Sequence, residues 1–161
     1  MSVSQEFVKS LFEYKDGNLY WIAKSGVRSH AIIGGKAGGY AVNGYESVSI
    51  KGVRFYTHRI IFLFHYGYIP KCLDHINGIR NDNRIENLRD VSFSQNMCNS
   101  KIHKNNKTGI KGVFKKASKY CVQVRFNNKQ NYFGSFEDLE FAELVAIEAR
   151  IKLHGIYAKH I

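Results

Sequence analysis

Apolar residues in the first part of the chain fall into short segments separated by turn-forming residues. Their helical spacing within residues 4–14, behind a serine suited to an N-cap, predicts a short amphipathic helix. Residues 19–22 are apolar and aromatic, which predicts a strand. Residues 45–50 and 53–57 flank a Lys-Gly pair and predict a hairpin. Residues 60–66 predict a short buried helix that ends at the next glycine.

Strand-like segments return later in the chain, at residues 110–116, 120–126 and 130–135. The middle segment alternates along its length. Its mostly apolar side carries Tyr120, Val122, Val124 and Phe126, and its other side carries Cys121, Gln123 and Arg125. An alternation with period two is typical of a strand with only one face in the core.

A long helix is predicted after these strands. Ser135 and Asp138 have the spacing of a capping box, and the helix is expected to run to His154 and to end at Gly155. Its apolar stripe contains Phe141, Ala142, Leu144, Val145, Ala149 and Leu153. Residues 108–161 therefore predict a three-stranded antiparallel sheet packed on one helix, with the other face of the sheet polar and basic.

The domain organisation follows from these segments. Ser92 and Gln95 resemble a capping box and place Asn96 in the first turns of a helix. The polar, basic segment 101–107 is the best candidate for a linker. We expect an α+β protein with one domain over residues 1–100 and a second over residues 108–161.

The charge is strongly positive and unevenly distributed. The chain has 24 Lys and Arg against 13 Asp and Glu, a formal net charge of +11. No acidic residue occurs from Val91 to Phe136, although nine Lys and Arg fall there. Nucleic acid and an anionic membrane are the partners that such a surface attracts, and the one-sided distribution favours nucleic acid.

The cysteines and the apolar runs narrow the class of protein further. Cys72, Cys98 and Cys121 form no C-x-x-C pair, so we expect reduced thiols and no structural zinc. The first residues contain no basic and apolar pattern of a signal peptide, and no apolar run reaches the length of a membrane span. We expect a cytoplasmic protein that is not secreted.

Asp74 and His75 are the strongest candidates for chemistry. Hydrolysis of a phosphodiester bond needs an activated water. It also needs a positive charge that offsets the negative charge on the scissile phosphate and on the leaving 3′ oxygen. A neutral histidine can act as general base on the water, and an aspartate can hold Mg²⁺ or Mn²⁺. Neighbours on an extended backbone point to opposite sides. Asn96 can supply a second oxygen ligand to one ion.

Residues 58–99 resemble the HNH endonucleases, in particular the phage and intron-encoded homing enzymes. The motif elements are Asp74-His75-x-Asn77-Gly78, Asn81-Asp82-Asn83, Glu86-Asn87-Leu88-Arg89 and an upstream His58-Arg59 pair. The resemblance implies a ββα-metal fold in which His75 is the general base and Asp74 and Asn96 hold the metal ion. It further implies that Asn87 braces the loop by hydrogen bonds and that Arg59 and Arg89 contact phosphates.

Residues 108–161 resemble the AP2 DNA-binding domain. The matching residues are Gly112-Val113, Tyr120-x-Val122-x-Val124-x-Phe126 and Tyr132-x-Gly134-x-Phe136, followed by the alanine-bearing helix. In that family the sheet enters the major groove. The resemblance implies DNA contacts from Lys111, Phe114, Lys116, Gln123, Arg125, Gln130 and Tyr132, although Phe114 stands where arginine is common. We expect Lys101, Lys104 and Lys107 to contact phosphates.

These expectations combine into a site-specific, divalent-metal-dependent endonuclease of the homing type. One site of this kind cuts one strand, so a monomer is expected to nick double-stranded DNA, and a dimer is the alternative. The rival function is a sequence-specific DNA-binding regulator whose nuclease half has decayed. An RNA-binding module is less favoured, because no pair of exposed aromatic residues stands out on a strand.

Overall fold

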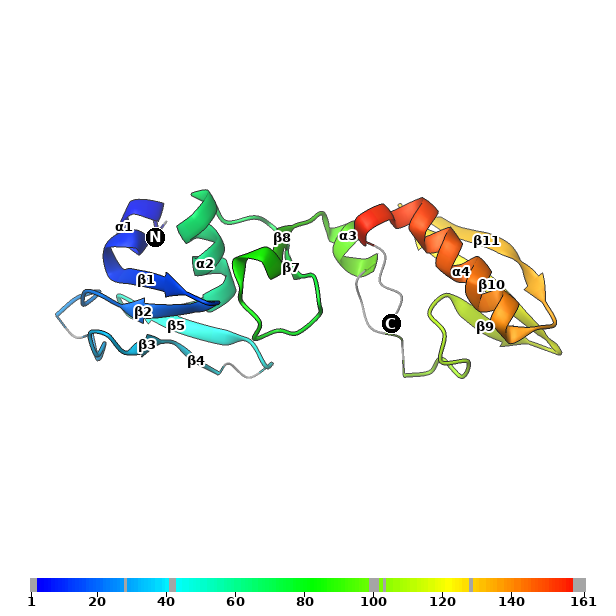
Figure 1. Ribbon diagram of the computed structural model, residues 1–161, viewed down its shortest axis with the longest axis horizontal. Helices are drawn as coiled ribbons and strands as arrows, with labels where there is room; N and C mark the ends of the chain where they lie inside the picture. Colours follow the sequence, from blue (N-terminus) through cyan, green and yellow to red (C-terminus); the bar gives the residue numbers. More distant parts are fainter. Residues whose placement is uncertain are drawn as a thin grey trace. The chain divides into compact units, whose positions relative to one another are not determined.

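The chain forms two compact units, Met1–Val91 and Ser92–Ile161. The structure is a computed structural model, and it describes residues 3–27, 29–40, 43–98, 102, 104–127 and 129–157. Figure 1 shows helices and short antiparallel strands in both units, an α+β arrangement as expected.

The first unit begins with a short helix that leads directly into a sheet. Helix α1 (Gln5–Leu11) starts at Ser4, whose Oγ accepts a hydrogen bond from the Phe7 N–H at 3.2 Å. The predicted helix is confirmed, but it ends before residue 12. There the chain enters β1 (Phe12–Lys15), which pairs with β2 (Asn18–Trp21), and β2 pairs in turn with β3 (Lys36–Ala37). The strand expected at residues 19–22 is thereby confirmed.

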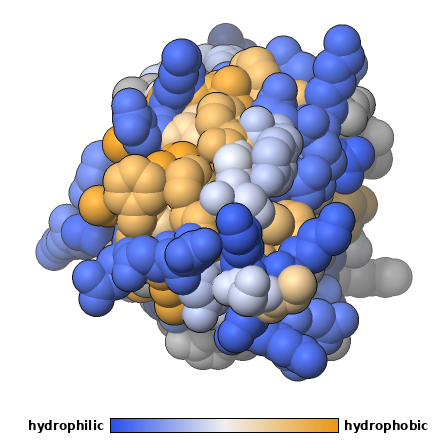
Figure 2. Space-filling view, turned by 90° about the vertical axis from the view of Figure 1, so that its right-hand side faces the viewer, coloured by the Kyte–Doolittle hydropathy of each residue, from blue (hydrophilic) through white to orange (hydrophobic). Residues whose placement is uncertain are grey.

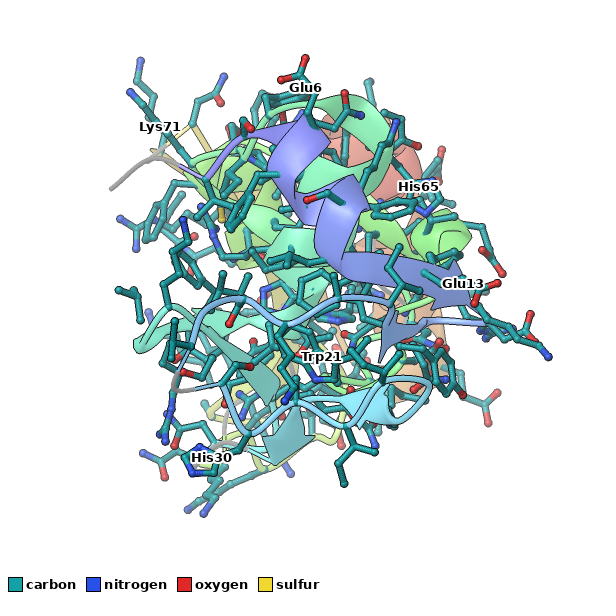
Figure 3. The ribbon with its side chains drawn as sticks, turned by 90° about the vertical axis from the view of Figure 1, so that its left-hand side faces the viewer. Glu6, Glu13, Trp21, His30, His65 and Lys71 are labelled. Carbon is teal, nitrogen blue, oxygen red and sulfur yellow. The ribbon has the colours of Figure 1, made fainter. Side chains whose placement is uncertain are left out.

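The cross-strand pair Phe12 and Trp21 explains this early helix end. The two residues are partners in the β1–β2 register, and their ring centroids lie 4.4 Å apart. Figure 3 shows Trp21 inside the unit, whereas Glu6, Glu13 and Lys71 lie at its edge. Burial of two aromatic rings outweighs the weak helix propensity of residues 12–14.

A second sheet contains the predicted hairpin. Its strands are β4 (Gly39–Tyr40), β5 (Glu46–Ile50) and β6 (Val53–Tyr56), in the order β4-β5-β6. Lys51 and Gly52 have φ values of 50° and 79°, which is the backbone of a two-residue hairpin turn with a favourable twist. The hairpin is confirmed, and it directs Val48 and Ile50 into the core.

Helix α2 (Thr57–Tyr66) continues from β6 and supplies much of the core. Ile60, Ile61, Phe62 and Leu63 are buried against α1 and the sheets. The helix ends at Gly67, whose φ of 81° is left-handed and whose N–H donates to the Leu63 carbonyl at 2.9 Å. The predicted buried helix and its glycine stop are confirmed.

The HNH-like region forms two strands followed in sequence by a helix. Strand β7 (Leu73–His75) pairs with β8 (Leu88–Asp90), the 3₁₀ turn η1 (Ile85–Asn87) precedes β8, and α3 (Phe93–Cys98) follows. The Ser92–Gln95 capping box is present, because Ser92 Oγ accepts from the Gln95 N–H at 3.2 Å and Gln95 Oε1 accepts from the Ser92 N–H at 2.7 Å. Helix α3 belongs to the second unit.

The second unit contains the predicted three-stranded sheet and its helix. Strands β9 (Val113–Lys116), β10 (Lys119–Phe126) and β11 (Lys129–Phe136) form an antiparallel sheet in the order β11-β10-β9. Helix α4 (Leu139–His154) packs on it, and the 3₁₀ turn η2 (Gly155–Tyr157) follows. Val113, Val122, Ala142 and Ala146 make the core of this unit.

Two details of α4 differ from the expectation. Asp138 is itself the N-cap, with its Oδ1 accepting from the Phe141 N–H at 2.6 Å, so Ser135 does not cap the helix. The buried stripe consists of Ala142, Ala146 and Ala149, because small side chains let the helix approach the sheet closely, while Phe141 and Leu144 are more than half exposed. Figure 2 shows apolar side chains gathered within a hydrophilic surround on this unit.

Two further observations concern the class of protein. The thiols of Cys72 and Cys121 are free, as expected, whereas the side chain of Cys98 lies outside the described residues. Within the described ranges, none of the helices has both the length and the apolar character needed to span a lipid bilayer.

Candidate active site

Asp74 and His75 lie next to each other on β7 and are both buried. The antiparallel register pairs Asp74 with Arg89 and His75 with Leu88 across β8. Successive residues of a strand point to opposite faces, so the two side chains leave β7 in opposite directions. Each side chain therefore has its own set of partners.

Asp74 is ion-paired with Arg89. Its Oδ2 accepts hydrogen bonds from Arg89 Nε at 3.0 Å and from Arg89 Nη2 at 2.8 Å. Both side chains are largely buried, and a buried carboxylate requires a positive partner to offset its desolvation. The expected metal ligand and one of the expected phosphate contacts thus lie in direct contact.

His75 begins a chain of buried polar groups that reaches the second sheet. Its Nε2 lies 3.1 Å from Asn83 Oδ1, and Asn83 Nδ2 donates to Glu46 Oε2 at 3.2 Å. Lys36 Nζ donates to the other carboxylate oxygen, Glu46 Oε1, at 2.9 Å. The sequence pattern assigned no role to Glu46 or Asn83. Asn83 stands within the HNH-like motif, but Glu46 carries no local signal.

His58 is packed beside His75 in a cluster of rings. Its ring centroid lies 5.1 Å from that of His75 and 5.2 Å from that of Tyr45, and it stacks on Tyr56 at 5.5 Å. Burial, with help from the nearby His75 and Arg59, lowers the pKa of His58 from 6.5 to about 3. His58 is therefore neutral at neutral pH, and its buried Nδ1 has no hydrogen-bond partner among the described residues.

Asn87 holds the loop between β7 and β8. Its Nδ2 donates to Asn77 Oδ1 at 3.0 Å and to the Asp82 carbonyl at 2.7 Å, and its Oδ1 accepts from the Asn77 N–H at 3.0 Å. These bonds reach both arms of the loop. Asn87 thus makes hydrogen bonds of the kind that its resemblance-based role requires.

Asp82 adds a second brace on the outside of the loop. It accepts hydrogen bonds from Arg84 Nε and Nη2, both at 2.8 Å, and from Asn77 Nδ2 at 2.6 Å. The hydrogen bonds from Arg84 are the main cause that lowers the pKa of Asp82 to about 2, and Asn77 adds to the effect. The carboxylate therefore stays ionised throughout the neutral range.

The remaining predicted residues of the HNH-like region have different surroundings. Arg59 Nη2 donates to the Pro70 carbonyl at 2.6 Å, which ties α2 to the segment before β7. Asn96 is half-buried on α3, in the second compact unit. The pairing of Asn96 with Asp74 stays a prediction.

The sheet of the second unit presents a polar face. Cross-strand partners on this sheet include Gln123 with Tyr132 and Arg125 with Gln130. Arg125 and Gln130 are exposed and Gln123 is half-buried, as is Lys111 before β9. Lys104, Lys107 and Lys116 are also exposed, while Lys101 lies outside the described residues.

Two exposed aromatic residues lie on this sheet, and both are among those that the AP2 resemblance places against DNA. Phe114 on β9 is 41% exposed and Tyr132 on β11 is 58% exposed. They lie on the two outer strands with β10 between them.

Comparison with known proteins defines the class to which this site belongs. Residues 55–98 match the family model of the HNH endonucleases, and the match contains α2, β7, β8 and α3. The chain therefore contains an HNH endonuclease domain, the domain of a nuclease family.

A curated relative matches a larger part of the chain. The chain belongs to the same family as Protein 3.8 of Escherichia phage T7, to which it is 33% identical over 97 residues. The aligned region covers 58% of this chain and 79% of the phage protein. No solved structure matches the chain significantly.

Proposed function

We propose that this chain is a site-specific, divalent-metal-dependent DNA endonuclease of the homing type. The observation that carries the proposal is the buried Asp74-His75 pair on β7, inside the region that matches the HNH family model. His75 acts as the general base on a water molecule. The substrate is double-stranded DNA, and the net charge of +11 favours its binding.

The proposed ligands of the metal ion suit a hard divalent cation. Asp74 and Asn96 offer oxygen donors, which Mg²⁺ and Mn²⁺ prefer, and Mg²⁺ commonly needs only one or two protein ligands besides water and phosphate. The Asp74 carboxylate is largely buried and already has a cationic partner in Arg89. Because the Asp74 carboxylate is buried, it needs a positively charged partner. The oxygen donors of Asp74 and Asn96 fit one divalent ion.

The chain's own residues divide the remaining tasks. A bound divalent ion supplies positive charge to the scissile phosphate and the leaving oxygen. His75 takes a proton from the attacking water, and Asn87 holds the loop in the shape that keeps β7 and β8 in register. Arg89, which is ion-paired with Asp74, carries a positive charge and can donate hydrogen bonds to a phosphate oxygen.

The second unit is proposed to select the DNA sequence. Gln123, Arg125 and Gln130 have side chains that can form two hydrogen bonds to a base edge in the major groove. Lys111, Lys116, Phe114 and Tyr132 flank them on the AP2-like reader, residues 108–161. Lys101, Lys104 and Lys107 form the basic connector at 101–107, which contacts phosphates. A monomer has one HNH site and therefore nicks one strand of the DNA. The reaction takes place in the cytoplasm of a phage host.

Plasmid cleavage tests the proposal. Supercoiled plasmid and phage DNA are incubated with the full chain in Mg²⁺, in Mn²⁺ and in EDTA, and nicked and linear products are scored separately. Nicked product that requires the metal ion supports the proposal. Sequence-specific binding without cleavage in either metal would contradict it and would favour the DNA-binding regulator.

A further inference from the structure

The hydrogen-bond chain from Glu46 to His75 has a fixed direction. The carboxylate of Glu46 can only accept hydrogen bonds, and its Oε2 lies 3.2 Å from Asn83 Nδ2. The amide nitrogen of Asn83 therefore faces Glu46, and the amide oxygen faces His75 Nε2 at 3.1 Å. Because an amide oxygen also only accepts, Nε2 of His75 must carry a hydrogen.

The direction of these hydrogen bonds determines which ring nitrogen of His75 can accept a proton. A neutral imidazole with its hydrogen on Nε2 has its basic lone pair on Nδ1. We infer that Glu46, acting through Asn83, is a positioning residue that holds His75 in the tautomer whose Nδ1 accepts the proton. The inference rests on the proposed role of His75 as the general base.

The three hydrogen-bonded residues are buried, which strengthens their control of the His75 tautomer. Glu46, Asn83 and His75 are 5%, 1% and 5% exposed. Water competes weakly for these hydrogen bonds, and in such surroundings linked bonds polarise one another. Lys36 Nζ bonds the second oxygen of Glu46 at 2.9 Å and so fixes the orientation of the carboxylate.

Glu46 lies outside the region that matches the HNH family model. Glu46 is the first residue of β5 and lies before residues 55–98. A carboxylate from the preceding sheet thus acts on the base through the loop between β7 and β8. Where a hydrogen-bond partner orients a metal-ligating side chain, its removal typically lowers activity by about 10- to 100-fold, and we expect a loss of this order for Glu46.

Nuclear magnetic resonance of the full chain with labelled histidine reports the tautomer directly. In the wild-type chain at pH 8, we expect His75 to show a single tautomer with its hydrogen on Nε2. In Glu46→Gln, residue 46 can donate as well as accept, so Asn83 can invert and both tautomers of His75 should appear. A hydrogen on Nδ1 in the wild-type chain would overturn the inference, and this measurement needs no variant.

Cleavage and binding are measured on the same proteins. Single-turnover cleavage by Glu46→Gln should fall by about 10- to 100-fold while DNA affinity stays constant, and Glu46→Asp should recover part of the loss. Glu13→Gln, which changes an exposed carboxylate on β1, should change neither. A single unchanged tautomer with unchanged cleavage in Glu46→Gln would also overturn the inference.

The two proposals fail in different ways. If the wild-type chain shows the expected tautomer and the expected change in Glu46→Gln but cuts no DNA, the positioning role stands and the proposed nuclease function fails. If the chain cuts DNA with its His75 hydrogen on Nδ1, the function stands and the positioning role fails.

Discussion

The side chain of one polar residue, Asn87, braces the loop that connects strands β7 and β8. Asn87 uses both ends of its amide to bond the backbone and side chain of Asn77 and the carbonyl of Asp82. An amide is well suited to this position, because it donates and accepts hydrogen bonds without introducing a charge at a buried position.

Replacing Asn87 with alanine should destabilise the chain. The substitution removes three hydrogen bonds and leaves the Asn77 N–H and the Asp82 carbonyl without this partner. We expect the free energy of unfolding to fall by roughly 1–3 kcal/mol and cleavage to fall with it. Urea denaturation measures the first effect. Asn105→Ala, at an exposed position, is the control, and equal stability of the two variants would contradict the bracing role.

His58 should make the stability of the chain depend on pH. Its folded-state pKa is about 3 and its ordinary value is 6.5. Above pH 6.5 the ring is neutral in both states and has no effect. As the pH falls from 6.5 towards 3, the unfolded chain binds a proton that the folded chain excludes, so stability drops by about 1.4 kcal/mol per pH unit.

A variant isolates this effect from the other titrating groups. His58→Phe keeps a ring between Tyr45 and Tyr56 and cannot bind a proton. Denaturation of both chains at pH 7.5 and pH 4.5 should show a smaller loss of stability in His58→Phe. An equal loss in the two chains would show that His58 binds its proton in the folded state.

The sequence singled out candidate site residues that lie close together in the chain. Asp74, His75 and Asn87 share one motif, and each type of side chain has an evident use. Glu46 could not be found in this way, because it is 37 residues from Asn83 and its link to His75 runs through that asparagine. Long-range pairing of strands places it there, and no local pattern encodes that pairing.

At the scale of elements, the periodic segments and several of their ends were predictable, but two helix ends were not. The hairpin at β5–β6 and the three strands of the second unit follow from alternation and turn residues. Helix α1 ends early because β1 pairs with β2, and α4 starts at Asp138 because that side chain can bond the Phe141 N–H. These outcomes depend on tertiary contacts and on cap geometry, which residue type alone does not determine.

The sheet β9–β11 carries the prediction about sequence preference. Arg125 is exposed on β10 opposite Gln130. Arg125→Ala should weaken binding to the preferred site by about 1–3 kcal/mol and should leave binding to unrelated DNA nearly unchanged. Titration with both DNAs, together with footprinting, measures the difference.

Lys104→Ala is the matched control for a positive charge that carries no sequence information. It should weaken binding to all sequences alike. Loss of one phosphate contact should reduce the slope of log affinity against log salt concentration by about 1. Unchanged preference in Arg125→Ala would remove that side chain from base recognition.

At the scale of the whole molecule, the chain combines a family-defined nuclease region with a separate sheet. The HNH match ends at residue 98, and the three-stranded sheet of the second unit begins at Val113. Helix α3, which carries Asn96, groups with the second unit, while Asp74 belongs to the first.

The role of His75 is the central claim, and single-turnover cleavage tests it most directly. His75→Ala, His30→Ala and the wild-type chain are compared in Mg²⁺ on one nicking substrate, with DNA affinity measured in parallel. His30 is exposed and lies outside the proposed site. We predict that His75→Ala loses at least about 100-fold in cleavage rate while its DNA affinity is retained, and that His30→Ala cuts normally. Undiminished cleavage by His75→Ala would contradict the account.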